Sequence, residues 1–229
     1  MVLVLVIGLL GAIVGVADTA ARRHAEAQVA GRMQAELQLT EAPQVRIGGL
    51  LFLGQFLRQH LDTVHVTADT ATVDVDGSRV ELQGVDLWLY DLSSDDWFDT
   101  ATVGRLEGAG LATWPSVTTL VGEEIAYSEP DDQGRGRVAI TQRLQFKGLD
   151  LPITLTGRPA IDEQSGKLEL VEPSVAVSGV TLPADLVADL VTSRLQPIDL
   201  PMPAGLKVTA VTAEPDGLAL TLRGADVTL

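Results

Sequence analysis

The stretch VELQGVDLWL (residues 80–89) decides how the fold is read, because its apolar pattern changes phase in the middle. Apolar residues occupy even positions before Gly84 and odd positions after it: Val80 and Leu82, then Val85, Leu87 and Leu89. Side chains along a strand alternate between two faces, so a bulge at Gly84 would return the later residues to the first face and bend the strand. The stretch therefore predicts a long, curved strand with one apolar face.

The last twenty residues of the chain repeat this device. Residues 70–89 overlie residues 210–229 after a shift of 140, and seven of the twenty positions are identical: Thr72/Thr212, Asp76/Asp216, Gly77/Gly217, Leu82/Leu222, Gly84/Gly224, Asp86/Asp226 and Leu89/Leu229. Both copies run as strand, Asp-Gly turn, strand and glycine, so Gly224 is also predicted to bend its strand. Either the chain contains two similar halves, about 40–122 and 123–229, or two hairpins use a common turn independently.

The rest of the chain alternates apolar and polar residues over many short runs. Helical spacing is confined to four segments beyond the N-terminal run: residues 18–40, 50–61, 113–122 and 182–195. Strands that do not alternate regularly with helices are typical of antiparallel sheets. The sequence therefore predicts an α+β fold whose long strands can curve around a helix or enclose an elongated apolar cavity.

Composition narrows the class of protein. The chain has 229 residues, with 16 basic and 31 acidic side chains and a net charge of −15, and such a charge argues against nucleic acid as a partner. There is no cysteine, which excludes disulfides, thiolate catalysis and cysteine-bound zinc. Aromatic residues make up only 4% of the chain, so the core is expected to consist of valine, leucine and alanine.

The N-terminus is an uncharged run, MVLVLVIGLLGAIVGVA (residues 1–17). As a helix it would span about 25 Å, a little less than a bilayer core. Small residues before Asp18 suit signal-peptidase cleavage, whereas Arg22 and Arg23 after the run suit an uncleaved membrane anchor. Either reading places residues 18–229, taken as a single domain, outside the cytoplasm in the cell envelope or periplasmic space.

Catalytic and metal-binding patterns are scarce. The three histidines, His24, His60 and His65, lack the spacing of metal ligands, and no G-x-S-x-G or phosphate-binding loop occurs. The run DDWFD (Asp95, Asp96 and Asp99) could hold Mg²⁺ on a diphosphate if a helix displayed it, but a solvated loop is the simpler interpretation. Its two aromatic residues either touch a membrane or pack back onto the sheet. We expect no catalytic residues, no metal and no cofactor.

Two stretches resemble a known family. VRIGGLLFL (residues 45–53) and the ending LPMPAGLKVTAVTAEPDGLALTLRGADVTL (residues 200–229) are similar to motifs of the actinobacterial LmeA-like, lipomannan-elongation family of phospholipid-binding proteins. Leu51 departs from the family, which usually has proline before the phenylalanine. The resemblance implies a tubular lipid-binding (TULIP-like) fold, a strongly curved antiparallel sheet wrapped around a long helix. It also implies phospholipid binding in the envelope in support of lipomannan-type glycolipids, with the membrane surface and an envelope glycosyltransferase as partners.

We expect the apolar segment 50–61 and the curved strands to form the lipid site. A buried methylene contributes about 0.8 kcal/mol, so an apolar lining alone can hold an acyl chain. The residues expected to line it are apolar and come from both halves of the chain: Leu50, Phe52, Leu53, Phe56, Leu57, Leu82, Leu87, Leu89, Leu186, Leu190, Leu220 and Leu222. Arg46, Arg58 and His60 are the expected headgroup contacts at the mouth.

Two other functions remain open on the sequence alone. One is a structural envelope protein whose apolar faces fill themselves, because a solid core and a lipid tunnel use the same residue types. The other is a metal-dependent envelope enzyme that uses the DDWFD aspartates.

Overall fold

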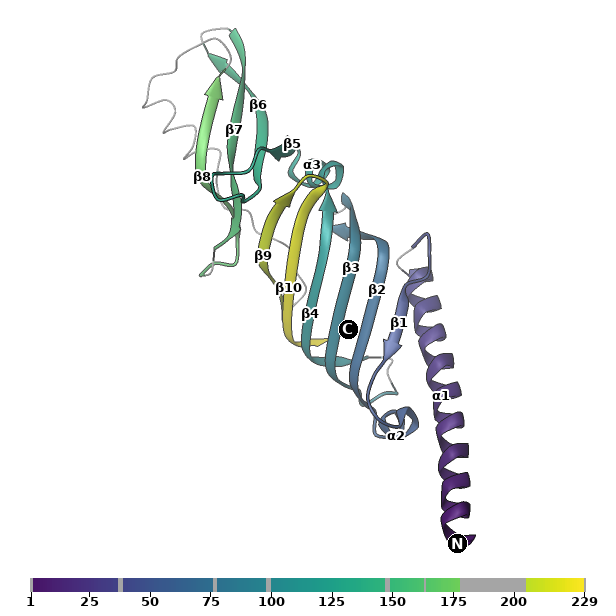
Figure 1. Cartoon of the computed structure of the whole chain (residues 1–229). Helices are drawn as coiled ribbons and strands as arrows, with labels where there is room; N and C mark the ends of the chain where they lie inside the picture. Colours follow the sequence, from purple (N-terminus) through teal and green to yellow (C-terminus); the bar gives the residue numbers. More distant parts are fainter. Residues whose placement is uncertain are drawn as a thin grey trace.

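The fold consists of two antiparallel sheets, with a long helix beside the larger one (Figure 1). The computed structural model describes residues 2–36, 39–75, 78–97, 100–146, 149–162, 164–177 and 205–228. No helix in these ranges is long and apolar enough to cross a membrane. The predicted α+β class is confirmed, whereas the predicted helix 182–195 lies outside the described residues.

The larger sheet has six strands in the order β1-β2-β3-β4-β10-β9, and all neighbours are antiparallel. Its strands are β1 (Gln44–Ile47), β2 (His60–Val75), β3 (Ser78–Ser93), β4 (Thr102–Thr113), β9 (Leu206–Glu214) and β10 (Gly217–Thr228). The smaller sheet has the order β5-β6-β7-β8. Its strands are β5 (Glu124–Ser128), β6 (Arg137–Phe146), β7 (Leu149–Ile161) and β8 (Leu168–Val177). A division near residue 122 therefore does not separate the sheets, since β9 and β10 return to the first.

The bulge predicted at Gly84 is confirmed. There β3 shifts its register against β4, and Gly84 has a φ of +58°, which glycine adopts without strain. Leu82 before the bulge pairs with Ala112, and Leu87 after it pairs with Gly108. Because every second residue of a strand lies on the same face, both leucines lie on one face of the sheet, which we call the inner face.

The bend predicted at Gly224 is wrong. Gly224 pairs regularly with Leu106 of β4, and the residue with a left-handed backbone is Asp226, with a φ of +52°. Aspartate tolerates this conformation better than most residues. Val227 directly after it is 1% exposed and belongs to the core, so the change of face occurs two residues later than predicted.

The two hairpins also differ in register. In the first hairpin Val75 pairs with Ser78, and in the second Glu214 pairs with Gly217. A shift of 140 would instead require residue 215 to pair with Leu218. The second turn thus lies one residue earlier within the repeat, and the structure gives the proposed duplication no support in its pairing. The Asp76–Gly77 turn and Leu229 lie outside the described residues.

The N-terminal residues form one continuous helix, α1 (Val2–Glu36), which merges the uncharged run with the helix expected over 18–40. Its second half packs against the core through Ala21, Ala25 and Met33 and contacts β1 and α2 (Phe52–Leu57). Its first half runs past α2, away from the sheet (Figure 1). Contact with the sheet is therefore made at the β1 edge, and wrapping of the sheet around a helix stays a prediction.

The two short helices lie at opposite ends of the larger sheet (Figure 1). The helix α3 (Trp114–Val121) is found where predicted, with Pro115 in its first turn. The helix predicted over 50–61 is wrong in length, because α2 covers only six residues. Leu51 before it and Gln59 after it both have positive φ, and the chain enters β2 at His60.

Buried apolar residues form two cores. The first core lies under α1 and α2 at one end of the larger sheet: Val45, Ile47, Phe52, Leu61, Val64, Val66, Leu89, Leu92, Val103, Leu106 and Val227. The second core joins the two sheets beneath α3: Ala112, Val117, Ile125, Val138, Val211, Ala213 and Leu218. The inner face of β3, β4 and β10 runs from one core to the other.

Candidate functional site

The residues predicted to line a lipid site fall into two described groups. The α2 group separates: Phe52 is buried in the first core, while Leu50, Leu53, Phe56 and Leu57 are exposed. Leu186 and Leu190 lie outside the described residues.

The sheet group comes together as predicted from the phase of the strands. Leu89 is buried in the first core. The other members lie between the two cores on the inner face and are only partly buried; we call them the leucine strip: Leu82, Leu87, Leu220 and Leu222. Leu87 packs against the first core, and Leu82 and Leu220 pack against the second. The strip is thus a continuous apolar path along the sheet.

The strand β4, which lies between β3 and β10, has glycine at two inner-face positions near its centre. Gly108 of β4 pairs with Leu87 on one side and with Leu222 on the other, and Gly110 pairs with Leu220. A Cβ added to Gly108 would lie 2.7 Å from Cδ2 of Leu87 and 3.4 Å from Cβ of Leu222. The Leu87 side chain therefore occupies the space above the Gly108 backbone.

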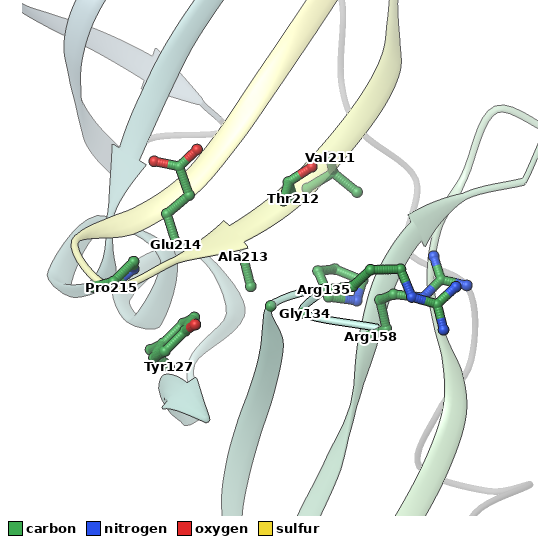
Figure 2. A pocket seen from close by; sticks show the side chains of 11 residues that line it. Tyr127, Gly134, Arg135, Arg158, Val211, Thr212, Ala213, Glu214 and Pro215 are labelled. Atoms are coloured by element: carbon green, nitrogen blue, oxygen red, sulfur yellow. The ribbon is translucent and has the colours of Figure 1, made fainter. Parts of the chain in front are cut away.

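A pocket of about 450 Å³ lies where β9 meets the smaller sheet. Figure 2 shows its lining: Tyr127, Gly134, Arg135, Gly136, Arg158, Pro159, Val211, Thr212, Ala213, Glu214 and Pro215. Val211 pairs with Leu220 and Ala213 pairs with Leu218. Cross-strand partners share a face, so Val211 and Ala213 lie on the face of the leucine strip, whereas Thr212 and Glu214 lie on the other face. The pocket is therefore at the β9 edge of the larger sheet.

Two arginines and the carboxylate of Glu214 line this pocket. Arg135 is held by carboxylates, with its Nε 2.6 Å from Oδ2 of Asp131 and its guanidinium 3.3 Å from Glu172. Hydrogen bonds from the Arg135 backbone N–H and side chain lower the pKa of Asp131. Arg158 differs, because its Nε is buried and has no hydrogen-bond partner among the described residues. A buried donor without a partner is uncommon.

The predicted headgroup residues lie elsewhere, near α2 and the β1 edge. Arg46 is exposed on β1, Arg58 donates its Nε–H to the carbonyl of Gly54 at 2.9 Å, and Nε2 of His60 lies 3.8 Å from Oδ1 of Asp62. They do not converge on the pocket. Arg158 was missed, and the available signal was a lone arginine within the apolar strand run LPITLTGRPAI.

Asp96, in the acidic run, accepts hydrogen bonds within its own turn. Oδ1 of Asp96 accepts hydrogen bonds from Oγ of Ser94 at 2.7 Å and from the N–H of Thr100 at 3.0 Å. These bonds, the one from Thr100 first, lower the pKa of Asp96. Asp95 is exposed and Asp99 lies outside the described residues. Within the described ranges, no three histidine or acidic side chains are grouped so that they could hold a metal ion.

Comparison with known proteins relates the chain to one family. A family model described as LmeA-like phospholipid-binding matches residues 16–223, nearly the whole chain. No curated protein and no solved structure matches the chain.

Proposed function

The chain belongs to the LmeA-like phospholipid-binding family, and from that premise we propose that it holds phospholipid acyl chains along the leucine strip. The observation that carries this proposal is the strip itself. Leu87 and Leu222 remain partly exposed in a sheet whose neighbouring residues, such as Leu89 and Val103, are buried. Each methylene removed from water along the strip would contribute about 0.8 kcal/mol.

We propose that the phosphate of the headgroup binds in the pocket at the end of the strip. Arg135 and Arg158 both line the pocket (Figure 2), and their positive charge supports this placement. Arginine is suited to phosphate because its guanidinium can donate two parallel hydrogen bonds. Val211 and Ala213 connect the pocket wall to the second core, so one lipid could contact both regions.

The wider setting is also part of the proposal. The family supports a TULIP-like fold and a non-catalytic role, and the uncharged run 1–17 supports export to the cell envelope by a signal peptide or an anchor. The sequence resemblance supports a role in lipomannan-type glycolipid synthesis beside an envelope glycosyltransferase. A metal-dependent enzyme is disfavoured because Asp96 is engaged in its own turn.

Lipid binding along the strip can be tested with the full chain purified from cells. Native mass spectrometry is expected to detect bound phospholipid, and Leu87→Ser together with Leu222→Ser should reduce the bound fraction about tenfold. The matched control is Leu111→Ser, because Leu111 is also partly buried but lies one residue out of phase with Gly110, on the other face of β4. Equal lipid content in the strip variant and the control would refute the placement. A chain that never carries phospholipid would favour a self-filled structural protein.

A further inference from the structure

The helix α2 buries one apolar residue, Phe52, together with a polar one, and leaves its other apolar side chains exposed. Its polar residue Gln55 is only 3% exposed, whereas Leu50 just before the helix is 87% exposed and Leu57 at its end is 70% exposed. A helix that packs on a core normally does the reverse. Single exposed leucines need no explanation, but exposed leucines on a helix that buries a glutamine do.

The buried glutamine is fully used, so the arrangement is specified by the sequence. Nε2 of Gln55 donates to the carbonyls of Gly48 at 3.2 Å and of Leu50 at 3.0 Å. Its Oε1 accepts the N–H of Asp62 at 2.8 Å. These bonds tie the loop before α2 to β2 and hold Leu50 outward. The apolar side chains thus stay in solvent because a satisfied polar anchor occupies the interior position.

A tryptophan from another loop extends the same surface. The rings of Phe56 and Trp97 lie 5.7 Å apart, and Trp97 is 56% exposed. The backbone N–H of Trp97 donates to Oε1 of Gln59 at 3.1 Å. The φ of Trp97 is +62°, which is an unfavourable backbone conformation for a bulky residue. We call the combined surface the α2 tip: Leu50, Leu51, Leu53, Phe56, Leu57 and Trp97.

The α2 tip is hydrogen-bonded to α1 next to Asp18, the first charged residue after the uncharged run. Oδ1 of Asp18 accepts the N–H of Leu53 at 2.8 Å, and Arg22 donates to the carbonyl of Gly49 at 3.1 Å. Before Asp18 the helix is uncharged, Val16 is exposed, and this part runs past α2 (Figure 1). The exposed tip and the uncharged run therefore lie at the same end of the molecule.

We propose that the α2 tip inserts into the interfacial layer of a phospholipid bilayer, alongside the uncharged run of α1. Continuity with that run favours a bilayer over a second protein. Exposed Arg23 and Arg58 lie near the tip, where they can meet lipid phosphates, and Trp97 suits the headgroup region. The proposal does not depend on where lipid is held inside the protein. It orients the larger sheet with its first core towards the membrane.

The chain contains no cysteine, so a single spin label can report depth in the full-length protein. We would label Leu57→Cys at the tip and, as the matched control, Leu120→Cys on α3, another exposed leucine on a short helix. Vesicles of equal parts phosphatidylcholine and phosphatidylglycerol serve as the probe. On vesicle addition the label at 57 should gain oxygen accessibility and lose access to a water-soluble nickel chelate by at least threefold, while the label at 120 stays unchanged.

Two outcomes would overturn the proposal. One is a label at 57 that stays water-accessible while the chain sediments with vesicles, which would mean that the uncharged run binds alone. The other is a label at 57 that becomes protected without vesicles as protein concentration rises, which would identify a second copy as the partner. A second variant, Leu50→Ser with Leu57→Ser, separates membrane binding from stability, because neither side chain is buried. It should keep its melting temperature but lose at least fivefold in vesicle affinity.

Discussion

The helices α2 and α3 lie at opposite ends of one sheet (Figure 1) and differ in how much of their apolar surface is exposed. In α3, Val117 is buried in the second core, and the buried Ser116 hydroxyl accepts the N–H of Glu81 at 2.8 Å. In α2, Phe52 and the amide of Gln55 are buried, while Leu53, Phe56 and Leu57 are exposed. The helix α3 contacts β3, β4, β5 and β10, whereas α2 mainly contacts α1 and β2.

The difference assigns separate roles to the two ends. The α3 end carries the arginine pocket, and Nε1 of Trp114 donates to the carbonyl of Pro215 at 2.9 Å, which fixes the turn beside the pocket. The α2 end presents apolar side chains to the outside. Binding chemistry is therefore expected at one end of the sheet and membrane contact at the other, with the leucine strip between them.

The largest effect is expected from the single apolar side chain that α2 buries. Phe52 is 4% exposed in the first core, so Phe52→Ala should lower the free energy of unfolding by about 3–5 kcal/mol. Phe56→Ala on the same helix should lower it by about 1 kcal/mol or less, because Phe56 is exposed. Urea unfolding of both variants measures the difference. Equal losses would show that the outer side of α2 is also part of the core.

The next effect concerns the bend that brings the strip onto one face. Gly84 has a φ of +58°, and the position that a Cβ would take there has no other atom within 4 Å. Gly84→Val should therefore lose about 1–3 kcal/mol through its backbone alone. Gly110→Ala is the control, since its nearest neighbour would be 3.7 Å away and its φ is ordinary. Chemical denaturation should separate the two variants, and a neutral Gly84→Val would mean that the bend does not need glycine.

A smaller effect is expected at the pocket. Arg158→Gln should reduce binding of an anionic phospholipid by about tenfold, which corresponds to about 1.4 kcal/mol, and leave binding of zwitterionic phosphatidylcholine less affected. Arg143→Gln, an exposed arginine of the same small sheet, should change neither. Competition binding with fluorescent lipids gives both affinities. Unchanged selectivity in Arg158→Gln would move the headgroup away from this pocket.

The smallest expected effect is on the pH dependence of stability, through Asp18, which links α1 to α2. The Leu53 N–H first, and then the Phe52 N–H and Arg22, lower the pKa of Asp18. A carboxylate with a lowered pKa stabilises the fold above its unfolded pKa, about 3.9, and loses that contribution as pH falls through the lowered value. The melting temperature should therefore fall less between pH 5 and pH 2.5 in Asp18→Asn than in the parent chain. Parallel curves would contradict this role.

Local pattern predicted much of this fold, and long-range pairing accounts for what it missed. Alternation located the strands, and the phase change located the bulge at Gly84. A phase change near the C-terminus could not say which residue bends, and Asp226 rather than Gly224 has the left-handed backbone. Leucine spacing in 50–61 predicted a helix but not which side faces inward, because Gln55 finds its partners in a loop and in β2.

The candidate site divides in the same way. The leucine strip followed from strand periodicity, since side chains two residues apart share a face. The pocket could not be foreseen, because it forms only where β9 meets the loop before β6 and the C-terminal part of β7. No local pattern relates Arg158 to Ala213 when the chain between them is that long.

Photo-crosslinking with a phospholipid that carries a diazirine in its acyl chain tests the central claim most directly. The lipid would be loaded into the full chain, and the complex would be separated from vesicles before irradiation. Lipid binding along the strip predicts adducts on β3 and β10, at Leu82, Leu87, Leu220 or Leu222, that disappear when unlabelled phospholipid competes. Adducts confined to the α2 tip or to the outer face of the sheet would contradict it.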